Sequence, residues 1–422
     1  MIKGEKVRFD IYKILYSIHK FNKTFNNIEI KKIVSKHTKK DIAFLNNVTL
    51  NSMRFHLHSL KIINKHVNKK FGDKEKILLI SAITQIVFLN FKEYAVINCS
   101  VEIAKKIKIY HGFINAVLKK ISQNKHKLRS TNIEFNDLPK WFKIKTISLT
   151  KNEKKLFLNN FNIEPSIHIV FKSEEKLKQF EEDLIKTSSI SGFLANKKNI
   201  IEIESFSNGD WWIQDFSSFF PLHNLLFKNN NKKFLDACSA PGGKAFQVLS
   251  RNNQVVLNDQ SKKRIKILNE NLQRLNFKTK VLNQDFSKFS LKEKFDFIII
   301  DAPCTAVGTI RKNPEIFFKN SSPNFQYLKN IQETLIKKAK TLLNKEGYIL
   351  YMTCSFLEYE TIDQIDKFLK ENSDFELYNF KLNKELDKYY KLIKGGLMIT
   401  LPDTILNHSI DGYFAACLKK NK

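Results

Sequence analysis

From residue 209 to the end, the chain alternates short apolar strands with helical segments. Apolar runs of strand length are each followed by a turn and then by an amphipathic pattern of helical period. Repeated units of this kind predict a mainly parallel, doubly wound sheet in a Rossmann-like α/β domain. The strands are expected at 234–237, 254–258, 279–283, 295–300 and 348–352.

Two cysteines stand at the ends of two of these strands. Cys304 closes the run Asp301-Ala302-Pro303-Cys304, and Cys354 lies within Thr353-Cys354-Ser355. An open α/β sheet binds its ligands beyond the carboxyl ends of its strands, so both thiols are expected at the functional edge. The two strands should be neighbours about 4.8 Å apart, which would let both thiols reach one ligand. The alternative interpretation is a pair of buried packing cysteines.

The rest of the chain divides by pattern. Residues 1–130 carry apolar stripes of helical period and almost no glycine, which predicts an all-α bundle. Residues 131–208 mix both patterns and are expected to form a small α+β connector. Residues 209–422 would then be the catalytic domain.

Charge suggests a polyanionic partner for the first of these domains. The net charge is +30, but lysine supplies nearly all of it, as the codons of an AT-rich genome would. Its distribution is more informative, because residues 1–130 hold 27 Lys and Arg against 8 Asp and Glu. We therefore expect this domain to face nucleic acid rather than merely to be well solvated.

Composition also bears on disulfides, metal sites and the cellular compartment of the protein. The five cysteines form no Cys-x-x-Cys pair and no cluster with histidine, so neither a disulfide framework nor a metal site is expected. No apolar stretch reaches the length of a membrane span. We expect a monomeric cytoplasmic protein with reduced thiols, no metal and no membrane contact.

A paired-glycine turn follows the first strand of the α/β domain. It reads Asp236-Ala237-Cys238-Ser239-Ala240-Pro241-Gly242-Gly243-Lys244, which fits neither a dinucleotide-binding turn nor a phosphate loop. Asp259 and Asp285 follow the next two strands, where carboxylates can accept the hydroxyls of an adenosine. One such carboxylate alone is more often a helix cap or a solvated residue, but carboxylates at three successive strand ends argue against coincidence.

These motifs resemble those of the S-adenosylmethionine-dependent RNA (cytosine-5)-methyltransferases. The turn 238–244 is similar to their cofactor motif, residues 301–304 with 308–315 to their fourth motif, and residues 353–355 to their sixth. The resemblance implies S-adenosylmethionine as the cofactor. It also implies the contact residues Cys238, Ser239, Ala240, Pro241, Gly242, Gly243, Lys244, Asp259, Asp285 and Asp301.

The resemblance also assigns roles in catalysis. It makes Cys354 the nucleophile that adds to the pyrimidine and Cys304 the thiol that assists product release. Asp301 would contact the base, or else only hold its loop. Arg311 and Lys312, just past the fourth motif, are plausible phosphate contacts, although a basic pair is often only solvated surface.

The amino-terminal bundle narrows the expected substrate. Residues 113–118 and the stripes before them resemble the NusB-type RNA-binding bundle that precedes this catalytic core in the bacterial RsmB (Sun/Fmu) group. That group acts on 16S ribosomal RNA, which is the expected substrate. Two alternatives stay open: transfer RNA as the substrate, or an RNA-binding or ribosome assembly factor without catalysis.

Overall fold

A computed structural model describes residues 4–25, 27–68, 70–196, 198–225, 232–289, 291–380, 390–393 and 396–421. The chain forms two compact units. Unit 1 is Met1–Thr150 with Ile310–Pro323, and unit 2 is Lys151–Thr309 with Asn324–Lys422. Each unit has its own apolar core.

Unit 1 is helical, as its apolar stripes predict. The stripe of the first helix is fully buried at Ile11, Ile14 and Ile18, and Thr38 caps a later helix by accepting from the backbone N–H of Asp41. Its elements are α1 (Glu5–Phe21), α2 (Ile28–Val34), α3 (Lys39–Arg54), α4 (His56–His66), α5 (Asp73–Ile83), η1 (Thr84–Phe88), α6 (Glu93–Lys106), α7 (His111–Ser122), α8 (Lys125–Leu128), η2 (Phe135–Asp137) and α9 (Lys140–Lys145).

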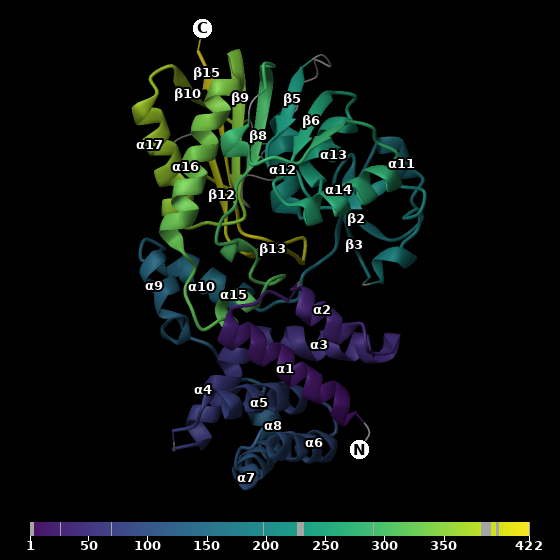
Figure 1. Cartoon of the computed structure of the whole chain (residues 1–422), viewed down its shortest axis with the longest axis vertical. Coiled ribbons are helices and arrows are strands. Elements are labelled where there is room, and N and C mark those ends of the chain that lie inside the picture. The colour runs from purple at the N-terminus through teal and green to yellow at the C-terminus, as the bar shows by residue number, and fades with distance from the viewer. Residues whose placement is uncertain are drawn as a thin grey trace. The chain divides into compact units, whose positions relative to one another are not determined.

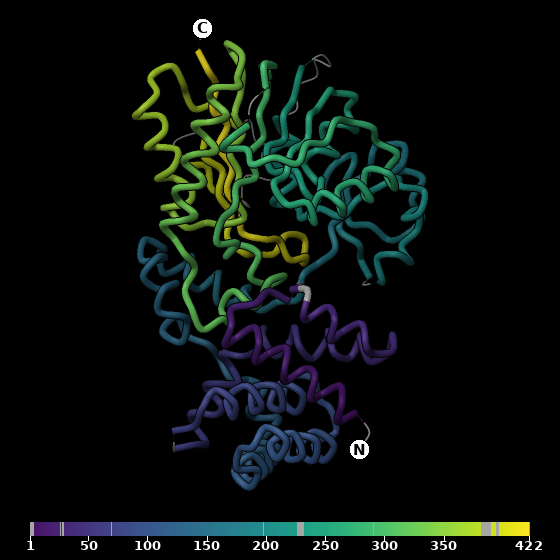
Figure 2. The backbone as a smooth tube through the Cα atoms, viewed as in Figure 1, coloured from purple at the N-terminus to yellow at the C-terminus, as the bar shows by residue number. Residues whose placement is uncertain are grey.

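A segment from the second half of the sequence completes unit 1. Residues 310–323, which include α15 (Glu315–Phe318), lie beside α1 and α3 and appear in green among the purple and blue helices (Figure 2). Phe318 is 2% exposed in the helical core, and its carbonyl accepts a 2.7 Å hydrogen bond from Nδ1 of His19. Phe317 packs edge-on against Trp141 and Phe142.

The expected connector at 131–208 does not stand alone. Residues 131–150 belong to unit 1, and the remainder contributes to a sheet ordered β2-β3-β1-β4 within unit 2. Its last strand lies beyond residue 208, because Ile169 and Val170 pair antiparallel with Ile213 and Trp212. The elements here are α10 (Lys151–Asn160), β1 (His168–Phe171), α11 (Glu174–Lys178), β2 (Leu184–Ser188), β3 (Ser191–Leu194), η3 (Ile200–Glu202) and β4 (Trp211–Ile213).

The large sheet of unit 2 has the order β11-β12-β15-β9-β8-β5-β6-β7, with β10 pairing β15 (Figure 1). The strands from β9 to β7 are parallel, and the strands added at β15 and beyond are antiparallel. The strands are β5 (Lys233–Asp236), β6 (Gln254–Asn258), β7 (Lys280–Leu282), β8 (Phe295–Asp301), β9 (Leu343–Thr353), β10 (Phe375–Tyr378), β11 (Lys391–Ile393), β12 (Leu397–Thr400) and β15 (Tyr413–Lys420), beside a hairpin of β13 (Asp403–Ile405) and β14 (His408–Ile410).

Helices cover both faces of this sheet, which confirms the doubly wound α/β prediction (Figure 1). Alternate residues of each strand point to opposite faces, so Phe297 and Ile299 join one core cluster while Ile298 and Ile300 join the other. One face is covered by α12 (Phe216–Leu225), α13 (Gly243–Leu249) and α14 (Lys262–Arg274), and the other by α16 (Phe325–Leu342) and α17 (Ile362–Glu371). The turns η4 (Phe286–Lys288), η5 (Val307–Thr309) and η6 (Glu358–Glu360) lie in the connections.

Candidate active site

The glycine turn lies between β5 and α13 and is held by its own polar contacts. Gly242 has a φ of +121°, and a Cβ there would lie 2.1 Å from the ring of Phe246, so only glycine fits. The Ser239 hydroxyl donates to the carbonyl of Asp236 at 2.7 Å and accepts from the backbone N–H of Asn258 at 3.0 Å. The turn is therefore tied to both β5 and β6.

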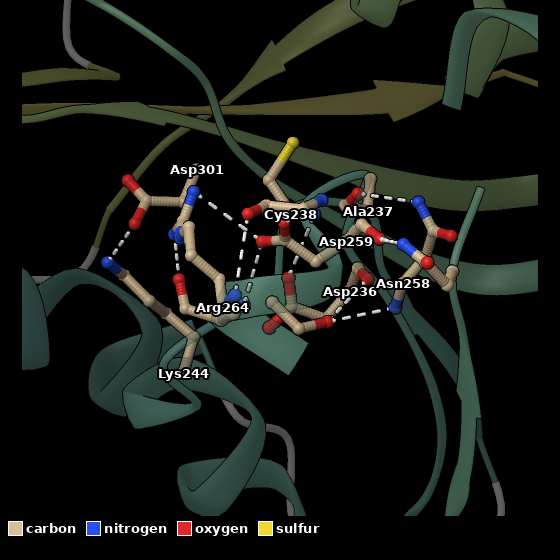
Figure 3. Close-up of polar contacts among 12 residues, drawn as sticks. Asp236, Ala237, Cys238, Lys244, Asn258, Asp259, Arg264 and Asp301 are labelled. Atoms are coloured by element: carbon tan, nitrogen blue, oxygen red, sulfur yellow. Dashed lines mark hydrogen bonds and ion pairs between the residues drawn. The ribbon is translucent and has the colours of Figure 1, made fainter. Parts of the chain in front are cut away.

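Asp259 is buried at the end of β6. One of its oxygens accepts from the backbone N–H of Ala240 at 3.2 Å, and the other from that of Ser261 at 2.9 Å. Arg264 lies within ion-pair distance at 3.5 Å (Figure 3). These contacts fix the carboxylate at the carboxyl edge of the sheet.

Asp285 follows β7 and caps the short turn η4. Its Oδ1 accepts from both the backbone N–H and the hydroxyl of Ser287, at 3.0 and 2.7 Å. Asp285 thus does cap a helical turn, which is one of the two roles considered for it. This role does not compete with ligand binding, because the same residue lines the cavity described next.

A cavity of about 500 Å³ opens at the carboxyl ends of β5, β6, β8 and β9. It brings together several residues that the sequence predicted, namely Cys238, Asp259, Asp285, Asp301, Cys304 and Cys354. The turn from Ser239 to Lys244 lies behind Cys238 and is not part of the lining. Side chains of α16 also line the cavity, among them Tyr327, Asn330 and Ile331, and sequence reasoning missed them.

Asp301 ends β8 and is held from two sides. Lys244 forms an ion pair with Oδ2, and the Tyr413 hydroxyl donates to Oδ1 at 2.7 Å. The Lys244 ammonium also lies 5.3 Å from the centre of the Tyr413 ring. Figure 3 shows Asp301 and Lys244 directed toward each other across the turn. This orientation fixes the carboxylate at the cavity wall.

The two thiols are neighbours, as the predicted strand pairing required. β8 and β9 pair in parallel, with Asp301 opposite Met352, and the backbone N–H of Ala302 donates to the Met352 carbonyl at 2.9 Å. The sulfurs of Cys304 and Cys354 lie 3.4 Å apart, and both residues are half-buried. The hydrogen bond to Cys354, together with burial, holds the pKa of the Cys304 thiol well above its usual value.

Burial also shifts the pKa values of two further groups near the turn. Burial raises the pKa of Cys238, and the surrounding carboxylates raise it further, so this thiol stays protonated and is a poor nucleophile. Burial raises the pKa of Asp236 to about 7, although the charge of Lys244 opposes the shift. Cys238 is therefore not expected to act as the nucleophile.

The prediction that Arg311 contacts an RNA phosphate is wrong. Arg311 is 1% exposed and is packed inside unit 1, where its carbonyl accepts from Arg54 at 3.1 Å. A guanidinium with this little exposure is not accessible to a backbone phosphate. Lys312 is exposed in the same segment, so its predicted phosphate contact stays a prediction.

Within the described ranges, no group of three or more His, Cys, Asp or Glu side chains could hold a metal ion. No helix in the described part of the chain is long and apolar enough to cross a membrane.

Comparisons with known proteins agree with this geometry. Residues 223–419 match the family described as 16S rRNA methyltransferase RsmB/F, and residues 6–123 match the NusB family. The carboxyl-terminal part of the chain is therefore similar to the RsmB/F methyltransferases, and its amino-terminal part is similar to NusB. These matches confirm the predicted NusB-like bundle, the methyltransferase fold and the use of S-adenosylmethionine.

Curated relatives match over most of their length. Ribosomal RNA small subunit methyltransferase B of Photorhabdus laumondii is 28% identical over 85% of this chain and 89% of its own length. The protein of the same name from Shewanella oneidensis is 27% identical over 90% of this chain and 91% of its own length.

Solved structures share the fold. The crystal structure of PH0851 is similar over 99% of both chains, with a TM-score of 0.71 at 19% identity. NSun6 from Pyrococcus horikoshii, solved with SFG, is similar over 67% of this chain and 98% of its own, with a TM-score of 0.56 at 16% identity.

Proposed function

We propose that this methyltransferase modifies C5 of a cytosine in small-subunit ribosomal RNA through a covalent bond between Cys354 and C6 of the base. The observation that carries the proposal is the 3.4 Å separation of two thiols in one cavity with Asp259, Asp285 and Asp301. Curated relatives named for small-subunit ribosomal RNA support the choice of RNA.

The cavity fits the cofactor both by its size and by the hydrogen-bond acceptors in its lining. Its volume of about 500 Å³ lies within the range of small-molecule sites. Carboxylates at the ends of β6 and β7 suit the hydroxyls of an adenosine, and Asp301 lies between them and the thiols. When bound, S-adenosylmethionine supplies an electrophilic methyl group.

C5 of cytosine is a weak nucleophile and needs activation. The sulfur of Cys354 adds to C6, which makes C5 electron-rich enough to take the methyl group. C5 then loses its proton to water, the electron pair of the C5–H bond restores the C5–C6 double bond, and the bond between sulfur and C6 breaks to release the Cys354 thiolate. A cysteine suits both steps because a thiolate attacks well and also leaves well.

The neighbouring groups fit supporting roles. A raised pKa keeps Cys304 protonated, so its S–H can donate to the Cys354 sulfur and assist release rather than attack. Asp301, held by Lys244 and Tyr413, is placed to hydrogen-bond the base as the adduct forms. A base inside a stack could not reach these groups, so an unpaired or opened RNA site is the expected substrate.

The test is methyl transfer to defined RNAs. Purified protein is incubated with S-adenosylmethionine and either 16S ribosomal RNA or total transfer RNA, and 5-methylcytosine is mapped by bisulfite sequencing. We expect a discrete position in 16S RNA. Methylation of transfer RNA alone would favour the alternative substrate, and RNA binding without methylation would favour a non-catalytic assembly factor.

A further inference from the structure

A fully buried carboxylate lies beneath the two thiol loops. Glu360, at the end of η6, is 0% exposed. Its Oε1 accepts from the backbone N–H of Thr305 at 2.8 Å and from Nε2 of Gln332 at 3.3 Å. Its Oε2 accepts from the hydroxyls of Thr305 and Ser355, both at 2.6 Å. Each oxygen thus has two donors.

These donors are the immediate neighbours of the catalytic thiols. Thr305 follows Cys304, and Ser355 follows Cys354, so one carboxylate ties the residue after each thiol to the same point. The two hydroxyls themselves are farther apart, at 3.4 Å.

The carboxylate is itself anchored. The Tyr351 hydroxyl of β9 donates to the backbone carbonyl of Glu360 at 2.8 Å. Gln332 of α16 also donates to the carbonyl of Pro303 at 2.9 Å and accepts from Gln364 of α17 at 3.1 Å. The network therefore connects both loops to the strand and to two helices that cover one face of the sheet. Because both oxygens of the Glu360 carboxylate are satisfied, the carboxylate is held rigidly.

A neutral side chain cannot replace this acceptor without loss. Burying a carboxylate is costly unless its lone pairs are satisfied, and burial does raise the pKa of Glu360 despite its four donors. A glutamine amide offers a single acceptor oxygen. In one orientation of the amide, its NH₂ group would face the N–H donors of Thr305 and Gln332. In the other, it would face the hydroxyls of Thr305 and Ser355, which would then have to accept hydrogen bonds instead of donating them. In both cases at least one tie between the loops weakens.

We propose that Glu360 is a positioning residue that sets the separation of the Cys304 and Cys354 sulfurs by holding the two loops on one carboxylate. The expected loss of methylation activity rests on the proposed two-thiol function. The expected change in the separation of the two sulfurs does not. Reacting groups must be held to within a fraction of an ångström, and a displacement of about 1 Å can cost roughly a hundredfold in rate.

The test compares matched variants of the full chain. Glu360→Gln removes the charge and two acceptor positions, and Glu358→Gln makes the same change on the exposed side of the same turn. Ser355→Ala detaches only the Cys354 loop. It serves as the second variant if Glu360→Gln does not fold, as judged by its thermal unfolding.

Two readouts separate positioning from general damage. The first is kcat and KM for methylation of 16S RNA. The second is the affinity for phenylarsine oxide, which condenses with two nearby thiols to form two As–S bonds and release one water. Tight binding needs both sulfurs in reach, is independent of RNA, and should be lost in Cys304→Ala.

We expect Glu360→Gln and Ser355→Ala to lower kcat by about ten- to a hundredfold with KM for S-adenosylmethionine within about twofold of wild type. The arsenical affinity should fall in parallel, by at least about tenfold, and Glu358→Gln should match wild type in both readouts. A fall in kcat with unchanged arsenical affinity would overturn the proposal, as would equal behaviour of Glu360→Gln and Glu358→Gln. Loss of arsenical affinity in a chain that methylates no RNA would support the positioning role and refute the proposed function.

Discussion

Phe318 lies in the catalytic half of the sequence, but its loss should destabilise the amino-terminal helical unit. The side chain is 2% exposed, and its ring packs against His19 and His56 at centroid distances of 5.4 and 5.5 Å. Phe318→Ala removes a buried ring and leaves a cavity, which costs about 3–5 kcal/mol. The hydrogen bond from His19 to the Phe318 carbonyl can survive, so the expected loss is mainly apolar packing.

Hydrogen exchange followed by mass spectrometry can locate this effect. Amides of α1 and α3 should exchange roughly 100- to 5,000-fold faster in Phe318→Ala, while amides of β5 and β8 should be unchanged. Phe21→Ala is the matched control, because Phe21 belongs to the same unit but is 62% exposed. Faster exchange confined to unit 2, or equal effects of the two variants, would refute the assignment of residues 310–323 to the core of unit 1.

Three other changes test separate features. Tyr413→Phe removes the hydroxyl that orients Asp301 and should lower kcat roughly fivefold, for a loss of about 1 kcal/mol; steady-state methylation kinetics equal to wild type would contradict this. Gly242→Ala should weaken S-adenosylmethionine binding in calorimetry by distorting the turn against Phe246, and unchanged affinity would show that the turn can adapt. Burial lowers the pKa of His56 to about 4 in the folded protein. Between about pH 6.5 and 4 the unfolded state therefore binds more protons than the folded state does, and unit 1 should lose stability as the pH falls through that window. Urea unfolding that reveals equal or greater stability of unit 1 at pH 5 than at pH 7 would exclude this.

Features that depend on residues close together in the sequence were predictable. Apolar runs of strand length, each followed by a helical pattern, fixed the α/β class. Because Cys304 and Cys354 close two such runs, their meeting at one sheet edge followed from the fold itself. Asp259 and Asp285 were found by the same rule, although the structure adds that each carboxylate also binds nearby backbone N–H groups.

Features that depend on contacts distant in sequence were missed. The segment with Arg311 reads as a basic surface loop, yet Arg311 is 1% exposed and the neighbouring Phe317 and Phe318 are buried in unit 1. Tyr413 and Glu360 carry no local signal of their contacts with Asp301 and Thr305, because those partners lie more than 50 positions away. Only the folded chain reveals which polar group meets which.

The most direct test of the central claim is the covalent bond between sulfur and RNA. Wild type, Cys304→Ala and Cys354→Ala are each incubated with 16S RNA and S-adenosylmethionine, denatured, and run on a gel that resolves protein–RNA adducts. We predict that Cys304→Ala accumulates a denaturant-resistant adduct because release is impaired, and that Cys354→Ala forms no adduct and no 5-methylcytosine. An adduct in Cys354→Ala, or methylation by that variant, would contradict the assignment of the nucleophile.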